Sequence, residues 1–111
     1  MEEIWKDIPD YNGRYQISNY GRIKSFAQDK IKGKIKNGSI TQKGYLTYLL
    51  YDNNGNKKWI PVHRIVATVF LDNPDHLPQV NHKDEDKTNN HIDNLEWCTN
   101  EYNSRYGTRS E

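Results

Sequence analysis

The chain has 111 residues, of which 33% are hydrophobic, and its 16 Lys+Arg nearly balance its 15 Asp+Glu to give a formal net charge of +1. This length suits one domain or two small modules, and no apolar run approaches the roughly 20 residues that a membrane-spanning helix needs. The single cysteine, Cys98, excludes an internal disulfide and a cysteine-rich zinc site, and the N-terminus lacks the basic and apolar regions of a signal peptide, so we expect an intracellular, cytoplasmic protein.

The small net charge hides two halves of opposite sign. Residues 1–62 carry 11 Lys+Arg against 6 Asp+Glu, whereas residues 63–111 carry 5 against 9. A basic half beside an acidic half suits a protein that contacts phosphate with one part and a divalent cation with the other. Ordinary solvated surface charge explains the same composition equally well, so the asymmetry alone does not choose between the two.

Two short stretches near the N-terminus alternate between apolar and polar residues. Tyr15–Ser18 and Arg22–Ser25 lie on either side of Asn19-Tyr20-Gly21, whose glycine favours a turn. The pattern predicts a small β-hairpin.

The segment from residue 22 to residue 43 is strongly basic and contains the single acid Asp29. Its basic residues are Arg22, Lys24, Lys30, Lys32, Lys34, Lys36 and Lys43. The lysines at positions 30, 32, 34 and 36 alternate, so in one extended strand their side chains would share a face. Such a row suits contact with successive phosphates of a DNA strand. An edge strand that its lysines protect against aggregation is the alternative interpretation.

The middle of the chain predicts a hairpin followed by a helix. Residues 45–51 and 57–62 are rich in strand-forming residues, and Asn54-Gly55 between them is a hairpin-turn signal. The next apolar residues recur at helical spacing, at Val62, Ile65, Val66, Val69 and Phe70. Asn73-Pro74 ends this amphipathic helix. A small antiparallel sheet followed by this helix resembles a minimal DNA-docking scaffold, and it would supply a core for the C-terminal part of the chain.

Two further apolar runs, residues 79–82 and 95–98, predict strands that a polar loop joins. Thr99 is a favourable N-cap for a helix after them, and an acidic residue comes next in its first turn. In this strand–loop–strand–helix unit, His82 leaves the first strand and Asn103 lies one turn into the helix. If the helix lies back across the hairpin, these two side chains meet around one metal-bound phosphate.

These residues resemble the HNH nuclease family, specifically the ββα-metal (His-Me) finger of phage and intron homing endonucleases. The matching positions, in family order and spacing, are Val80-Asn81-His82-Lys83-Asp84, Asn89-Asn90, Asn94-Leu95-Glu96-Trp97 and Asn103. The stretch from Ile4 to Ser25 is similar to the short NUMOD4-like module found ahead of such fingers. The resemblance implies an α+β fold of small antiparallel β-hairpins and an amphipathic helix, followed by the finger. It implies a β-rich DNA-binding module over residues 1–58 and a nuclease module over residues 59–111.

The resemblance also implies a role for each polar position. His82 would activate the water that attacks the phosphodiester bond, which a neutral imidazole can do near neutral pH. Asn81 and Asn103 would hold one divalent cation, Mg²⁺ or Mn²⁺, through their amide oxygens. Asn94 belongs to the catalytic set and would pin the loop. The products would be a 5′-phosphate and a 3′-hydroxyl.

Double-stranded DNA is the partner that the resemblance implies, with no nucleotide cofactor and no membrane. The predicted DNA contacts are Arg22, Lys24, Lys30, Lys32, Lys34, Lys36, Lys43 and Arg64. Many relatives carry Asp where this chain has Asn81, and two neutral amides hold a cation more weakly than a carboxylate and an amide do. Related enzymes often add a C-terminal helical DNA-reading module, so action as a dimer, with a partner protein or as part of a longer enzyme stays open. A phage-encoded enzyme of this kind would act in the host cell.

Other interpretations of the same residues are weaker. A zinc site at His82 and His91 lacks a cysteine pair to complete it. The acidic run after His82 suggests a calcium loop, but it has Asn89 where that loop needs glycine and Leu95 where it needs glutamate. For the loop residues 89–91 we expect solvated or DNA-facing roles. A non-catalytic DNA-binding protein with a degenerate HNH finger is the alternative function.

Overall fold

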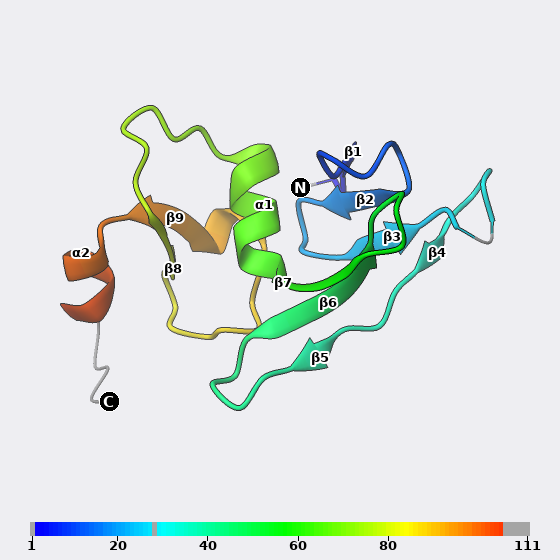
Figure 1. The fold of residues 1–111 in the computed structure, drawn as a ribbon. Coiled ribbons are helices and arrows are strands. Elements are labelled where there is room, and N and C mark those ends of the chain that lie inside the picture. Colours follow the sequence, from blue (N-terminus) through cyan, green and yellow to red (C-terminus); the bar gives the residue numbers. More distant parts are fainter. Residues whose placement is uncertain (1, 28, 106–111) are drawn as a thin grey trace.

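The computed structural model describes residues 2–27 and 29–105, so the last residues of the predicted nuclease module, 106–111, lie outside the described residues. Within the described residues the chain forms three antiparallel sheets and two α-helices, and α1 lies between the C-terminal hairpin and the other sheets (Figure 1). This arrangement confirms the predicted α+β architecture. Neither of the described helices has the length and apolar character that a membrane span requires.

Four short N-terminal strands form the first sheet in chain order: β1 (Trp5–Asp7), β2 (Tyr15–Ser18), β3 (Ile23–Ser25) and β4 (Lys34–Ile35). The predicted β2–β3 hairpin is present, and Ile17 and Ile23 pair across it and are fully buried. Asn19, in the turn, also ties down the N-terminal segment, because its Oδ1 accepts from the Ile4 amide at 2.8 Å.

The alternating lysines do not lie on one strand, so that part of the sequence prediction is wrong. Residues 30–32 form a turn in which the Asp29 carboxylate accepts from two backbone amides, at 3.1 and 3.0 Å. Gly33 then adopts a φ of +72°, a conformation that residues with side chains rarely adopt. Only the two residues of β4 pair with β3. Aspartate and glycine at these positions are turn-forming residues, and their local hydrogen bonds override the alternation.

The second sheet contains β5 (Ser39–Ile40), β6 (Leu46–Tyr51) and β7 (Lys57–Pro61). Asp52 holds the turn between β6 and β7, because its carboxylate accepts from two amides of the turn at 2.8 and 2.9 Å. α1 (Val62–Phe70) begins directly after Pro61, whose backbone is extended. Val62, which the sequence pattern placed in both the strand and the helix, is therefore the first residue of the helix.

The C-terminal unit is a hairpin of β8 (Gln79–His82) and β9 (Leu95–Cys98), followed by α2 (Asn100–Arg105). A short 3-10 turn, η1 (Ile92–Asn94), leads into β9. Thr99 is the N-cap of α2, since its hydroxyl accepts from the Tyr102 amide at 3.0 Å. The predicted strand–loop–strand–helix unit is therefore confirmed.

The core is centred on α1, whose buried apolar face meets residues of all three sheets in one cluster. The members are Ile8, Tyr15, Ile17, Ile23, Tyr48, Leu50, Val62, Ile65, Val66, Ala67, Val80 and Leu95. Full burial of a side chain of this size contributes roughly 1.5–3 kcal/mol relative to exposure. The two predicted modules, residues 1–58 and 59–111, share this core, and their division at residue 58 stays a prediction.

A second contact joins the turn of the β2–β3 hairpin to the loop between β8 and η1. The rings of Tyr20 and His91 stack with their centroids 4.8 Å apart. Gly21 lies so close to Asn90 that a Cβ on the glycine would come within 2.7 Å of the Asn90 Cβ. The N-terminal hairpin therefore supports the loop after β8.

His63 is a buried polar residue in the first turn of α1. Its ring stacks on Tyr45 with the centroids 5.0 Å apart, and its Nδ1 has no hydrogen-bond partner among the described residues. Burial lowers the pKa of His63 from 6.5 to about 3, and repulsion from His82 and Arg64 adds to the decrease. The His63 ring is therefore neutral at neutral pH.

Gly21→Ala should destabilise the protein more than Gly55→Ala does. Both glycines have positive φ, +87° and +83°, and left-handed backbone costs an ordinary residue about 1–2 kcal/mol. Only the change at Gly21 adds a collision with Asn90, because nothing lies within 4 Å of a Cβ at Gly55. Thermal unfolding of both variants measures the difference. Equal decreases in Tm would show that the hairpin turn does not press on the loop.

His63→Phe should reduce the loss of stability at acidic pH. The unfolded chain protonates His63 below about pH 6.5, whereas the folded chain does so only near pH 3. Between these values the unfolded state binds more protons, so the free energy of unfolding of the wild type falls as the pH falls. Phenylalanine keeps a ring against Tyr45 and does not titrate. Urea unfolding of both proteins across this pH range tests the prediction, and parallel pH profiles would contradict it.

Candidate active site

The register of β8 and β9 decides which polar side chains meet across the hairpin. Asn81 pairs with Glu96, and His82 pairs with Leu95. Directly opposed residues of antiparallel strands point to the same face of the sheet. The Asn81 amide therefore reaches Glu96, and its Nδ2 donates to Glu96 Oε2 at 2.8 Å. Only 1% of Asn81 is exposed, so this pair is built into the finger.

His82, the last residue of β8, is 3% exposed and is oriented by the loop after it. Its Nε2 lies 2.8 Å from Asn90 Oδ1, and Asn90 Nδ2 donates to the Thr88 carbonyl at 3.4 Å. With the amide oxygen facing the ring, the neutral imidazole carries its proton on Nε2, and Nδ1 is the proton-accepting nitrogen. The expectation of a solvated or DNA-facing Asn90 is wrong, because Asn90 is buried and bound to His82.

Two aromatic rings pack beside the His82 imidazole. The ring centroid of His63 lies 5.0 Å from that of His82, and the centroid of Tyr45 lies at 6.1 Å. Because His63 is neutral at neutral pH, it places no positive charge against His82. His63 belongs to α1, and Tyr45 directly precedes β6. Residues outside the finger therefore contribute to the surroundings of the His82 imidazole.

Asn94 pins the loop between β8 and β9, the role that the family resemblance implies. Its Nδ2 donates to Asp84 Oδ1 at 2.8 Å and to the Asn89 carbonyl at 2.9 Å, and its Oδ1 accepts from the Asp84 amide at 3.0 Å. Hydrogen bonds, the strongest from the Asn89 side chain, lower the pKa of Asp84 and keep it a charged acceptor. Asn94 thus supports the residues directly after His82, and its place in the catalytic set stays a prediction.

Asn103 lies one turn into α2, where its amide donates to the Thr99 carbonyl at 3.1 Å. The helix packs against β8, and the Tyr102 hydroxyl donates to Glu96 Oε2 at 3.3 Å. The structure therefore brings the helix that carries Asn103 beside the strand that ends in His82 (Figure 1).

The buried amide of Asn81 has the donor chemistry that a divalent cation needs. Its Oδ1 is buried and has no hydrogen-bond partner among the described residues. An unsatisfied buried acceptor costs about 1–3 kcal/mol, and an amide oxygen is a hard ligand of the kind that Mg²⁺ and Mn²⁺ accept. Within the described part of the chain, no three His, Cys, Asp or Glu side chains gather into a metal site. The residues present fit a cation that binds amide oxygens and further oxygens from outside the chain.

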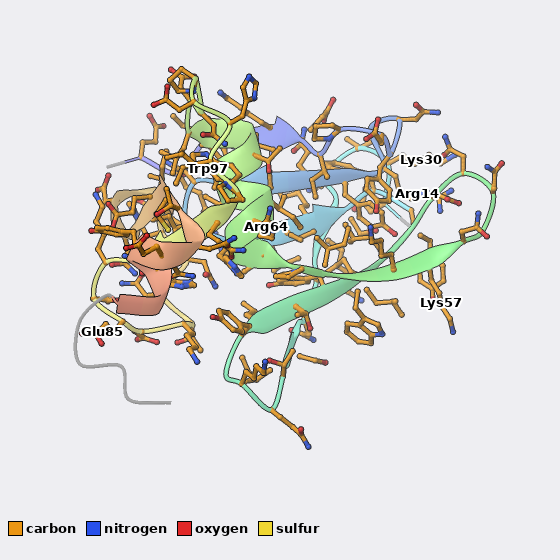
Figure 2. All side chains as sticks on the ribbon, turned by 60° about the vertical axis from the view of Figure 1, so that its left-hand side comes forward. Arg14, Lys30, Lys57, Arg64, Glu85 and Trp97 are labelled. Carbon is orange, nitrogen blue, oxygen red and sulfur yellow. The ribbon has the colours of Figure 1, made fainter. Side chains whose placement is uncertain are left out.

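The residues predicted to contact DNA differ in their surroundings. Arg22 forms a two-bond ion pair with Glu3, which lowers the pKa of Glu3, and the Nζ of Lys24 lies 4.1 Å from the centre of the Trp5 ring. Lys30 lines a surface hollow together with Arg14, on the opposite side of Figure 2 from Glu85 of the finger loop.

The other predicted DNA contacts are spread over the rest of the molecule. Lys32 and Lys34 are exposed at the β3–β4 end, and the Nζ of Lys36 lies 5.9 Å from the centre of the Tyr15 ring. Lys43 lies next to the finger loop, because its carbonyl accepts from a lysine of that loop at 2.8 Å. Arg64 donates to the Pro78 carbonyl at 3.1 Å and lies near Trp97 in Figure 2. The structure does not gather these cations into one row, and their contact with DNA stays a prediction.

Sequence reasoning missed two residues of this site. The sequence motif includes Asn90, but only the folded loop shows that its side chain forms a hydrogen bond with His82. Glu96 can be found from strand pairing, since counting along the hairpin places it opposite Asn81 once one pair is known. The loop of 12 residues between the strands hides that register in the sequence.

Comparison with known families and proteins agrees with this geometry. Residues 3–51 match the NUMOD4 motif, and residues 61–105 match the HNH endonuclease family. DNA endonuclease I-HmuI of Bacillus phage SP01 is 38% identical over 99 residues, which are 89% of this chain and 54% of that protein. An uncharacterised HNH endonuclease of Acanthamoeba polyphaga mimivirus is 42% identical over 92 residues, which are 83% of this chain and 26% of that protein.

A solved structure is similar as well. It is described as DNA binding and cleavage by the HNH homing endonuclease I-HmuI, and it matches with a TM-score of 0.78 and 39% identity over 93% of this chain and 55% of that chain. The chain thus spans about a quarter to about half of the length of these relatives. Residues 61–105 belong to the HNH endonuclease family, and residues 3–51 ahead of them match the NUMOD4 motif.

Proposed function

We propose that this chain is a metal-dependent endonuclease of the homing type, which nicks or cleaves double-stranded DNA by phosphodiester hydrolysis. The observation that carries the proposal is the presence, at the end of one strand, of an imidazole oriented by Asn90 and a buried amide oxygen without a partner at Asn81. The first group suits a general base, and the second suits a cation ligand. The similarity to I-HmuI, which is named a DNA endonuclease, supports DNA as the substrate.

His82 accepts the proton of the attacking water at Nδ1, because the hydrogen bond to Asn90 keeps the N–H proton of the neutral ring on Nε2. The same bond fixes the plane of the ring. After proton transfer, the imidazolium donates a charge-assisted hydrogen bond to Asn90, which is stronger than the bond that the neutral ring makes. His63 adds packing without a competing positive charge.

When bound, a single divalent cation, Mg²⁺ or Mn²⁺, would stabilise the charge on the departing 3′ oxygen. That oxygen takes up a proton from solvent as its bond to phosphorus breaks, so the products are a 5′-phosphate and a 3′-hydroxyl. Asn81 and Asn103 are the residues that would hold it, through amide oxygens. Because both side chains are neutral, they leave the site with a net positive charge that favours a DNA phosphate as the next ligand.

Basic side chains of the N-terminal half supply the phosphate contacts in this proposal. Lys30 and Lys32 lie in the turn that Asp29 caps, and Lys34 is the first residue of β4, so the three do not form a row along one strand. Lysines that contact only phosphates add affinity without sequence preference.

His82→Ala should lower the rate of DNA cleavage by about 10²–10⁴-fold, the usual contribution of general acid–base catalysis. Asn103→Ala should also strongly reduce the cleavage rate but leave DNA affinity unchanged, because the proposed role of Asn103 is to hold the cation. Single-turnover cleavage of supercoiled plasmid at saturating Mn²⁺ measures the rates, and circular dichroism checks folding.

His76→Asn is the matched control for His82→Ala. His76 lies in an exposed loop with a φ of +52°, which asparagine tolerates. This variant should cleave at the wild-type rate. A folded His82→Ala protein that also cleaves at the wild-type rate would show that His82 is not the general base.

Replacing Lys30, Lys32 and Lys34 together by glutamine should weaken DNA binding without changing which sequence is preferred. Each phosphate contact contributes about 0.9 to the slope of log K against log[salt], so the slope should fall by up to about 3. Binding of both proteins to two duplexes of different sequence across a salt series measures this. Lines of equal slope would show that these lysines face solvent in the complex.

A further inference from the structure

Glu96 lies where three elements of the finger meet. It is a partly buried residue of β9, and its Oε2 accepts from Asn81 Nδ2 of β8 at 2.8 Å. The same oxygen accepts from the hydroxyl of Tyr102 in α2 at 3.3 Å. One carboxylate therefore binds the strand that carries Asn81 and the helix that carries the neighbouring Asn103. These are the two elements that would present amide ligands to a cation.

The bond to Glu96 fixes which end of the Asn81 amide is presented to a ligand. A carboxylate only accepts hydrogen bonds, so it must face the Nδ2 group of Asn81. The Oδ1 atom then points away from Glu96, and it is this atom that is buried and has no partner among the described residues. If the amide turned over, Oδ1 would face a negative oxygen and the bond would be lost. Glu96 thus selects the orientation in which Asn81 offers an oxygen.

The charge of Glu96 adds a second effect. A hydrogen bond from Nδ2 to a carboxylate draws positive character to the nitrogen and leaves more negative charge on Oδ1, as outer partners do when they make metal ligands more basic. The carboxylate also places a negative charge in direct contact with a neutral ligand residue. A site whose two protein ligands are uncharged gains its attraction for a cation from such a neighbour.

We propose that Glu96 is the positioning residue of the cation site: it orients the Asn81 amide, raises the basicity of Oδ1 and ties α2 to the hairpin through Tyr102. This proposal rests on the proposed function, because it assumes that a cation binds at Asn81. The pair has a distinctive property, since an amide and a carboxylate can exchange places and keep both the hydrogen bond and the net charge.

The exchange of the two groups gives a test without metal. Asn81→Asp alone puts two carboxylates against each other with no donor between them, so Tm in EDTA and mildly alkaline buffer should fall. Adding Glu96→Gln restores one amide–carboxylate bond with the donor on the other strand, and Tm should recover although a second residue has changed. Effects of the two single variants that simply add in the double variant would overturn the proposed pair.

The metal affinity tests the function of the pair. Glu96→Gln keeps the size of the side chain and an acceptor oxygen but removes the charge and the fixed orientation. The affinity for Mn²⁺, measured by electron paramagnetic resonance of the free ion, should fall by about 10–100-fold, the usual cost of losing an outer-shell partner. At saturating Mn²⁺ the cleavage rate should approach that of the wild type, because the change acts on the affinity and leaves His82 in place.

Two further variants complete the design. Asp10→Asn removes one negative charge in the loop between β1 and β2, where a φ of +73° suits asparagine, and Mn²⁺ affinity should not change. Tyr102→Phe removes the weaker of the two bonds to Glu96 at an exposed position, and it should lower the affinity less than Glu96→Gln does. It keeps the test decisive if Glu96→Gln folds poorly.

The outcomes separate the two proposals. Wild-type protein that neither binds Mn²⁺ nor cleaves DNA would overturn the proposed function, and the role of Glu96 with it. Wild-type protein that does both, while Glu96→Gln and Tyr102→Phe bind Mn²⁺ as tightly as the wild type, would overturn the role of Glu96 alone.

Discussion

The antiparallel register of β8 and β9 is the constraint on which the rest of the site depends. It sets Asn81 opposite Glu96 and His82 opposite Leu95. A slip of one residue would turn the side chains of one strand to the other face of the hairpin, and the polar contacts of the site would be lost. Val80 and Leu95 are buried in the core around α1, so hydrophobic packing fixes the register. The chemistry of the finger is therefore specified by apolar residues that take no part in it.

The N-terminal hairpin takes part in the same construction from outside the finger. Its turn accepts a hydrogen bond from the Ile92 amide at the Asn19 carbonyl, at 2.9 Å, and Gly21 packs against Asn90. Asn90 in turn orients the His82 imidazole. Direct contacts thus lead from the NUMOD4 region to the proposed general base. Gly21 is needed both for its positive φ and for its lack of a side chain. This requirement links the two regions of the chain more closely than their separate sequence motifs indicate.

The elements of the fold were largely predictable, because they depend on local patterns. The period of Val62, Ile65 and Val66 predicted α1, and Thr99 predicted the start of α2. The prediction failed where two local signals competed, since the capped turn after Asp29 defeated the alternation of the lysines. The partners of the site were not predictable, because they depend on tertiary contacts. The bond between Asn90 and His82 requires the folded loop, and that between Glu96 and Asn81 requires the register.

The claim that this geometry forms a hydrolytic site is tested most directly with unmodified protein and supercoiled plasmid. The protein is incubated with Mg²⁺, with Mn²⁺ or with EDTA, and the ends of any product are typed by ligation and by polymerase extension. The account predicts nicked or linear DNA with either cation, with ligatable 5′-phosphate and extendable 3′-hydroxyl ends, and intact plasmid in EDTA. Protein that retards the plasmid in a gel but leaves it intact with every cation would contradict the account and support the non-catalytic DNA-binding alternative.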